Sequence, residues 1–208
     1  MTTISTYLTL KEGVAAWSAR DDLTTLIPDF VNYAHMEIGR TLRANVNTLT
    51  ADLAISGESV AIPTRFRMGK RIYLDTTPRR IVQFTSPEIR ASVTSEYTSA
   101  QYPEWAAVEG DYIYFGPVPT TTATGKILYY ATPATLSADA DTNVVLTKYP
   151  YMYLYGALAE LFRYIEDVDN ADRYETRFRG LIAEVNKTEA WDNIGNMTQG
   201  RPSAGSVV

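Results

Sequence analysis

The sequence contains no cysteine and only one histidine, His35, among its 208 residues. The absence of cysteine excludes disulfides, thiolate nucleophiles and cysteine-ligated metal sites. A single histidine excludes metal sites built from several histidines, and a histidine-dependent catalytic triad would have to use His35. The sequence also lacks any run of about 18 apolar residues, so it predicts no transmembrane helix and no membrane partner.

Familiar catalytic and binding motifs are missing as well. Neither a G-x-S-x-G nucleophile motif nor a G-x-x-x-x-G-K-[ST] phosphate loop occurs. The run from Asp167 to Asp172 resembles the start of a calcium loop, but Asp172 and Phe178 stand where such a loop needs glycine and glutamate. We interpret these carboxylates as helix caps, and His35 as a surface or polar packing residue. We therefore expect no enzymatic activity, no metal and no other cofactor.

Acidic residues outnumber basic ones, 24 to 19, and the net charge of −5 argues against a general nucleic-acid coat. Residues 65–90 reverse this balance, with seven basic side chains against two acidic ones. Such a basic segment fits a contact with another subunit or partner, a solvated face with packed aliphatic stems, or nucleic-acid binding. The partner contact is the interpretation that we carry forward, for Arg65, Arg67, Lys70, Arg71, Arg79 and Arg80.

Apolar residues make up 45% of the chain, which is typical of a globular protein. A chain of this length buries roughly 70% of its unfolded surface, enough for a core in one domain or two small ones. Fifteen tyrosines are many for this length. They suit subunit interfaces and β-strands equally well, so both interpretations stay open.

Helical periodicity occurs at both ends of the chain. Thr9 and Glu12 fit a capping box, and Pro28 opens a longer helix that we expect to end near Arg43. The helical period returns at Thr147, and Asp169 is positioned to cap a last helix.

Between these ends the apolar period is two. Residues 46–62 alternate around a turn at 56–59 and predict a hairpin. Further strands are expected at 71–74, 80–84, 104–108, 112–115 and 126–131, with a short helix after Ser86. We predict an α+β fold, in which residues 1–45 and 147–190 form a helical bundle. Residues 46–146 would be an inserted antiparallel β-sandwich or barrel, and residues 191–208 a flexible C-terminal arm.

An ordered set of motifs over residues 8–190 resembles the head-to-tail adaptor, or connector, proteins of tailed bacteriophages. Each motif alone has little specificity, and the ordered set carries the resemblance. They are Arg20-Asp-Asp-Leu23, Ile27-Pro-Asp-Phe30, Arg40-Thr-Leu-Arg43, Ser86-Pro-Glu-Ile89, Tyr112-Ile-Tyr-Phe-Gly-Pro-Val-Pro119, Tyr129-Tyr-Ala-Thr-Pro133, Leu146-Thr-Lys-Tyr-Pro150 and Tyr153-Leu-Tyr-Gly-Ala-Leu-Ala-Glu160.

The resemblance implies a structural, non-enzymatic virion protein that forms a homo-oligomeric ring of twelve copies at the neck. The ring would assemble in the host cytoplasm, join the portal protein to a tail or nozzle protein, and leave a channel for genome ejection. DNA would pass through that channel without specific binding. From the residues alone, a cytosolic binding module that uses the basic β face for nucleic acid or an acidic partner remains the alternative.

Two further sets of residues receive roles in this ring. Acids lining the channel would repel DNA and keep it sliding, and the candidates are Glu160, Glu166, Asp167 and Asp169. The C-terminal arm would dock onto the portal, rooted at Trp191. Its candidate contact residues are Trp191, Ile194, Met197, Arg201, Val207 and Val208.

Overall fold

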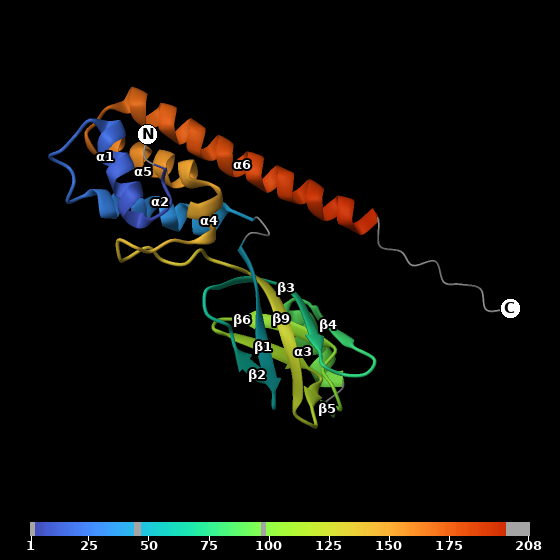
Figure 1. Cartoon of the computed structure of the whole chain (residues 1–208). Coiled ribbons are helices and arrows are strands. Elements are labelled where there is room, and N and C mark those ends of the chain that lie inside the picture. The colour runs from blue at the N-terminus through green and yellow to red at the C-terminus, as the bar shows by residue number, and fades with distance from the viewer. Residues whose placement is uncertain (1–2, 44–46, 97–98, 199–208) are drawn as a thin grey trace. The chain divides into compact units, whose positions relative to one another are not determined.

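Two units make up the chain in the computed structural model, which describes residues 3–43, 47–96 and 99–198 (Figure 1). Helices form the first unit, Met1–Asn47 with Pro133–Val208, and strands dominate the second, Thr48–Thr132. The fold is therefore α+β. The β unit ends earlier than the expected insertion of residues 46–146, because the segment from Pro133 onward belongs to the helical unit.

The helical unit is organised around α5, which packs against every other helix of the unit. Met152, Leu154, Leu158 and Leu161 of α5 are fully buried, as is typical of a helix that is apolar over most of its circumference. The helices of this unit are α1 (Tyr7–Ser18), α2 (Ile27–Thr41), α4 (Val144–Lys148), α5 (Pro150–Tyr164) and α6 (Val168–Thr198).

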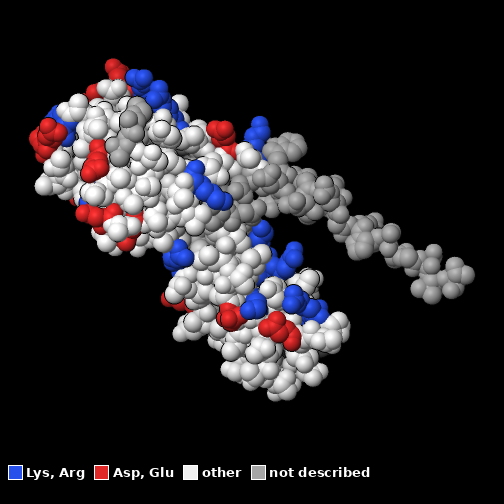
Figure 2. Space-filling view, viewed as in Figure 1, with Lys and Arg blue, Asp and Glu red and all other residues white. Residues whose placement is uncertain are grey.

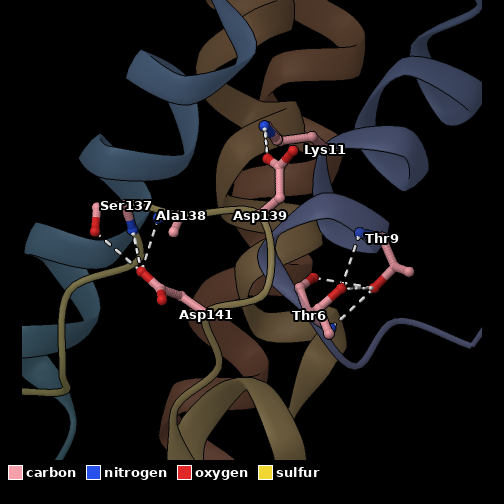
Figure 3. Close-up of polar contacts among 7 residues, drawn as sticks. All are labelled: Thr6, Thr9, Lys11, Ser137, Ala138, Asp139 and Asp141. Carbon is pink, nitrogen blue, oxygen red and sulfur yellow. Dashed lines mark hydrogen bonds and ion pairs between the residues drawn. The ribbon is translucent and has the colours of Figure 1, made fainter.

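Helix α1 begins one turn earlier than the predicted capping box. Thr6 is the N-cap, and its Oγ1 accepts a hydrogen bond from the Thr9 backbone N–H at 3.3 Å. The Thr9 Oγ1 in turn accepts from the Thr6 N–H at 2.9 Å, so threonine does what glutamate does in the usual box (Figure 3). The N–H groups of Tyr7 and Leu8 donate to the carbonyls of Asp141 and Asp139, at 2.8 and 3.0 Å. The segment that follows the β unit therefore provides hydrogen-bond acceptors for the first backbone N–H groups of α1.

Asp141 holds this return segment in a tight loop (Figure 3). Its Oδ2 accepts from the backbone N–H of Ser137 and of Ala138, both at 2.8 Å, and from the Ser137 hydroxyl at 3.0 Å. These hydrogen bonds, first that from Ala138, hold the pKa of the Asp141 carboxyl below its usual value. Lys11 closes the arrangement through an ion pair with Asp139 at 2.7 Å.

A polar network lies under the same segment. The fully buried Tyr153 places its hydroxyl 2.9 Å from His35 Nδ1 and 3.0 Å from Asn143 Nδ2. Asn143 also accepts from the Leu146 N–H at 2.8 Å and thereby caps α4. Burial raises the pKa of Tyr153 and lowers the pKa of His35, which is half-buried. With Nδ1 unprotonated, a neutral His35 accepts a hydrogen bond from the Tyr153 hydroxyl, while the Asn143 amide donates one to the hydroxyl oxygen.

Acidification is expected to weaken the fold through His35. Its pKa is below the unfolded value of about 6.5, so the unfolded chain binds more protons and stability falls as the pH drops below that value. The variant His35→Gln keeps an acceptor for Tyr153 without a titrating ring. Urea unfolding between pH 8 and 5 should show a steeper loss of stability in the wild type than in His35→Gln. Equal slopes in the two proteins would contradict this role.

The β unit is a mostly closed barrel of seven strands, with a hydrophobic core that includes Leu53, Ile55, Ile72, Phe115 and Ile127. The strand order is β1-β9-β3-β4-β6-β7-β2. The strands are β1 (Thr48–Ile55), β2 (Ser59–Ala61), β3 (Phe66–Leu74), β4 (Arg80–Phe84), β6 (Trp105–Glu109), β7 (Tyr112–Gly116) and β9 (Ala123–Ala131). A separate pair joins β5 (Ser99–Ala100) and β8 (Val118–Pro119).

Two features of the pairing differ from the prediction. The turn after β1 leads into β2, but the two strands form no hairpin, since β1 pairs with β9 and β2 with β7. The sheet is also mixed rather than antiparallel, because β4 and β6 run parallel. Helix α3 (Pro87–Glu96), expected after Ser86, lies in the connection between them, and parallel neighbours need such a long crossover.

Helix α6 runs to Thr198, beyond the expected helix end at residue 190. The predicted arm therefore begins as helix, which includes Trp191, Ile194 and Met197. A single glycine, Gly195, costs a helix only about 1 kcal/mol, so it does not end α6. Arg201, Val207 and Val208 lie outside the described residues. None of the described helices is long and apolar enough to cross a membrane.

Candidate partner-binding surface

The basic residues expected to contact a partner gather on β3, β4 and the turns beside them, as Figure 2 shows over this side of the β unit. Side-chain alternation separates the two faces of β3: Ile72 and Leu74 are buried in the barrel, whereas Arg71 is exposed. We call this surface the basic sheet face. It consists of Arg65, Arg67, Lys70, Arg71 and Arg79 together with Met68, Tyr73 and Ile81. Arg80 borders this face, because it lies opposite the buried Leu74 and therefore points to the other side of the sheet at the start of β4.

Aromatic rings lie beside three of the cations of this surface. Arg79 lies over Tyr73, with 4.7 Å from its guanidinium carbon to the ring centroid, and Arg80 lies over Tyr102 at 5.0 Å. Lys70 Nζ is 5.4 Å from the ring centroid of Tyr130. Exposed contacts of this kind contribute about 0.5–1 kcal/mol each and hold the cations in place at the surface.

Few acids balance these charges locally. Asp75 is the single acidic residue between positions 65 and 80. Within the described part of the chain, Arg71, Arg79 and Arg80 form no ion pair. Lys126, which borders the face on β9, is paired with Asp52 at 2.6 Å, and this hydrogen bond raises the pKa of Lys126. The positive charges of Arg71, Arg79 and Arg80 therefore remain available to a partner.

Large apolar side chains lie among the cations. Met68 is 52% exposed and Ile81 is 60% exposed, although both belong to strands. A shallow pocket of about 310 Å³ adjoins Ile81 and reaches Trp105 of β6. Exposed apolar and aromatic groups mixed with arginine are typical of protein interfaces. Met68, Ile81 and Trp105 were not predicted as part of this surface, because alternation alone does not say which side of a strand faces outward.

Arg90 was counted with the basic segment, but the structure separates it from this surface. Its side chain is only 10% exposed and forms ion pairs with Glu58 and Glu109, both at 3.2 Å. Its guanidinium also lies over the ring of Tyr114 at 5.0 Å. Arg90 therefore ties α3 to the barrel and offers no charge to a partner.

The four acids proposed for a channel fall into two places. Glu160 lies on α5 and forms an ion pair with Arg163. Glu166, Asp167 and Asp169 lie at the turn between α5 and α6, where Asp167 accepts from the Asn170 N–H at 3.2 Å. The helix-cap interpretation of this run thus holds for Asp167. Across the described residues, no three histidine, aspartate or glutamate side chains converge as a metal site.

Tyrosines occur both on the strands of the barrel and on the helices. Tyr73 and Tyr130 lie on strands of the barrel, whereas Tyr151, Tyr155 and Tyr174 form an aromatic cluster on α5 and α6. Tyr151 is 48% exposed, so the helical unit also presents aromatic surface.

The comparisons with known proteins concern the whole of this architecture. No curated protein matches the chain. The family of SU10 adaptor proteins does match, over residues 5–202, a range that includes every described helix and strand. Since the match covers both units, the chain belongs to the SU10 adaptor protein family, a family of phage adaptor proteins.

Proposed function

We propose that the chain forms a ring of twelve copies that joins the portal to the tail at the head–tail junction and leaves a channel for DNA. Membership of a phage adaptor family supports the general part, a structural virion protein that contacts other virion components and is not an enzyme. The observation that carries the finer part is the basic sheet face, whose cations and exposed apolar groups are arranged for a protein partner.

Helix α6 supplies a second means of contact. It has 31 residues against 15 in α5, so by helix geometry it is about 46 Å long. Figure 1 shows it running well past α1, α2 and α5 of the same unit. Asn186 still contacts the end of α2, donating to the Thr41 carbonyl at 3.2 Å. We propose that the part of α6 beyond Asn186, with the residues that follow, reaches the portal.

The charge of the ring suits a passage for DNA. At −5 per chain, twelve copies carry a charge of about −60 in total, which favours repulsion of DNA over its binding to the ring. Of the four candidate channel acids, Glu160 and Asp167 already have partners among the described residues. Glu166 and Asp169 are exposed and are the stronger candidates.

Truncation of the C-terminal segment tests the proposal. We compare the full chain with a variant lacking residues 199–208, each mixed with the portal protein of the same phage, by mass photometry and electron microscopy. The full chain should add a ring of about twelve copies to the portal. The truncated chain should fold equally well, since every described helix is retained, but attach more weakly because it lacks the last ten residues of the arm.

Two outcomes would count against this picture. A full chain that stays monomeric beside the portal would overturn the ring. Attachment at full strength without residues 199–208 would overturn the docking role of the arm and leave the ring standing.

The alternative function, a binding module for nucleic acid, rests on the same arginine and tyrosine pairs, because such pairs also bind single strands by stacking. Fluorescence anisotropy with duplex and single-stranded oligonucleotides separates the two. Salt-dependent binding that is lost in Arg71→Glu would favour this alternative, and no binding at low salt would exclude it.

A further inference from the structure

We infer that the basic sheet face of one copy docks onto the α5–α6 corner of a second copy. The α5–α6 corner consists of Tyr164, Glu166, Val168, Asp169 and Asp172. The inference rests on the proposed ring and names the surfaces through which its copies would meet.

The division of charge between the units points to a second copy as the partner. Residues 48–132 hold eight basic and eight acidic side chains, so the whole net charge of −5 belongs to the helical unit. Within the β unit, six of the eight basic residues lie between positions 65 and 80. One copy thus presents a positive face on its β unit and a negative helical unit, and complementary surfaces of this kind select their partners.

The α5–α6 corner is the part of the helical unit that matches the basic sheet face in apolar character too. Val168 is 64% exposed and Tyr164 is 60% exposed, which places both among the most exposed large apolar side chains described. The ring of Tyr164 packs against Phe30 with centroids 5.7 Å apart, so its position is fixed before any partner binds.

The acidic residues beside Tyr164 and Val168 are not neutralised by ion pairs. Glu166, Asp169 and Asp172 are exposed, and none of them forms an ion pair within the described part of the chain. Arg163, the cation nearest in sequence to Glu166, is already paired with Glu160 and Glu175. The corner therefore combines exposed apolar groups with uncompensated negative charge.

The two surfaces complement each other in both respects. Met68 and Ile81 supply apolar area among cations, and Tyr164 and Val168 supply it among carboxylates. Because the surfaces differ, the contact is heterologous: each copy uses its face on one neighbour and its corner on the other. Contacts of this type repeat from copy to copy and produce a closed ring when the rotation closes.

Charge exchange between two variants provides the test. The first variant carries Arg71→Glu with Arg79→Glu, and the second carries Glu166→Lys with Asp172→Lys. Each alone should lose self-association by about tenfold or more, because like charges then meet at every contact. An equimolar mixture should recover association, since each reversed surface finds its opposite on the other variant. Sedimentation velocity at low and physiological salt measures both effects.

A matched control separates docking from net charge. Lys148→Glu with Lys187→Glu makes the same charge change as the first variant, at exposed positions of α4 and α6, and it should leave association unchanged. Variants that assemble like the wild type, or a mixture that fails to recover, would overturn the docking. The ring itself is judged on the wild type with the portal, so the two proposals fail separately.

The natural absence of cysteine allows a direct check of the contact. A tagged chain with Ile81→Cys is mixed with an untagged chain carrying Val168→Cys under mild oxidation. Cross-linking between the two chains should exceed that of Ile81→Cys with Val144→Cys, whose target is 50% exposed on α4. Equal yields for the two pairs would contradict the proposed surfaces, whether or not a ring forms.

Discussion

Replacing Gly156 by valine is expected to lower the free energy of unfolding by about 3 kcal/mol, the upper end of the usual cost of overpacking. Gly156 lies on α5 where α2 and α6 both approach it. A Cβ atom there would stand 2.8 Å from the Cβ of Ala34 and 3.1 Å from Cε2 of Phe178. Both neighbours are buried, so the helices would have to move apart to admit the larger side chain.

Urea unfolding of three variants measures this effect. Gly156→Ala should lose less than Gly156→Val, because it adds one carbon rather than three. Gly180→Ala on α6 is the matched control, since a Cβ there meets nothing within 4 Å. It should gain roughly 0.5–1 kcal/mol from helix propensity. If Gly156→Ala proves as stable as Gly180→Ala, the close approach of the helices is not what requires glycine at 156.

Replacing Arg90 by leucine should destabilise the barrel by about 2 kcal/mol. The change removes a guanidinium that two glutamates share and leaves both without a partner. Removal of one member of a buried pair costs about 3–5 kcal/mol. The expected loss is smaller here because Glu58 and Glu109 are 54% and 37% exposed, so water can solvate them.

A surface arginine provides the comparison for Arg90. Arg80→Leu removes an exposed cation from the start of β4 and should change stability by less than about 0.5 kcal/mol. Thermal unfolding followed by circular dichroism measures both proteins. A loss in Arg90→Leu no larger than that in Arg80→Leu would show that the buried ion pairs contribute little.

Local patterns predicted the elements better than their pairing. Alternation located the strands at 80–84 and 112–115 because the barrel buries one face of each. The hairpin between residues 46 and 62 was wrong, because pairing depends on partners remote in the chain: β1 bonds to β9 along its whole length, from Thr48 to Ile55. The parallel pair of β4 and β6 is likewise a tertiary property that a turn signal does not contain.

The candidate surface was predictable in its charge but not in its composition. A count of basic residues located β3 and β4 but also included Arg90, since the count contains no information on burial. Arg79 lies over Tyr73 of β3, and Arg80 lies over Tyr102 in a loop. These contacts join residues that are not close in sequence, so no local spacing predicts them. The extent of α6 beyond residue 190 was not predicted, because the residues after Trp191 are rich in glycine and poor in apolar residues, although one glycine, Gly195, does not end a helix.

The insertion of the β unit into the helical unit has a consequence for synthesis on the ribosome. Helices α1 and α2 are made first, but α5, the helix on which both pack, begins only at Pro150. At about 5–20 residues per second, roughly 5–20 s pass before the chain reaches that helix. The barrel is one continuous segment, Thr48–Thr132, and all of it is synthesised before α5. The apolar faces of α1 and α2 therefore lack their main packing partner until the whole barrel segment has been made.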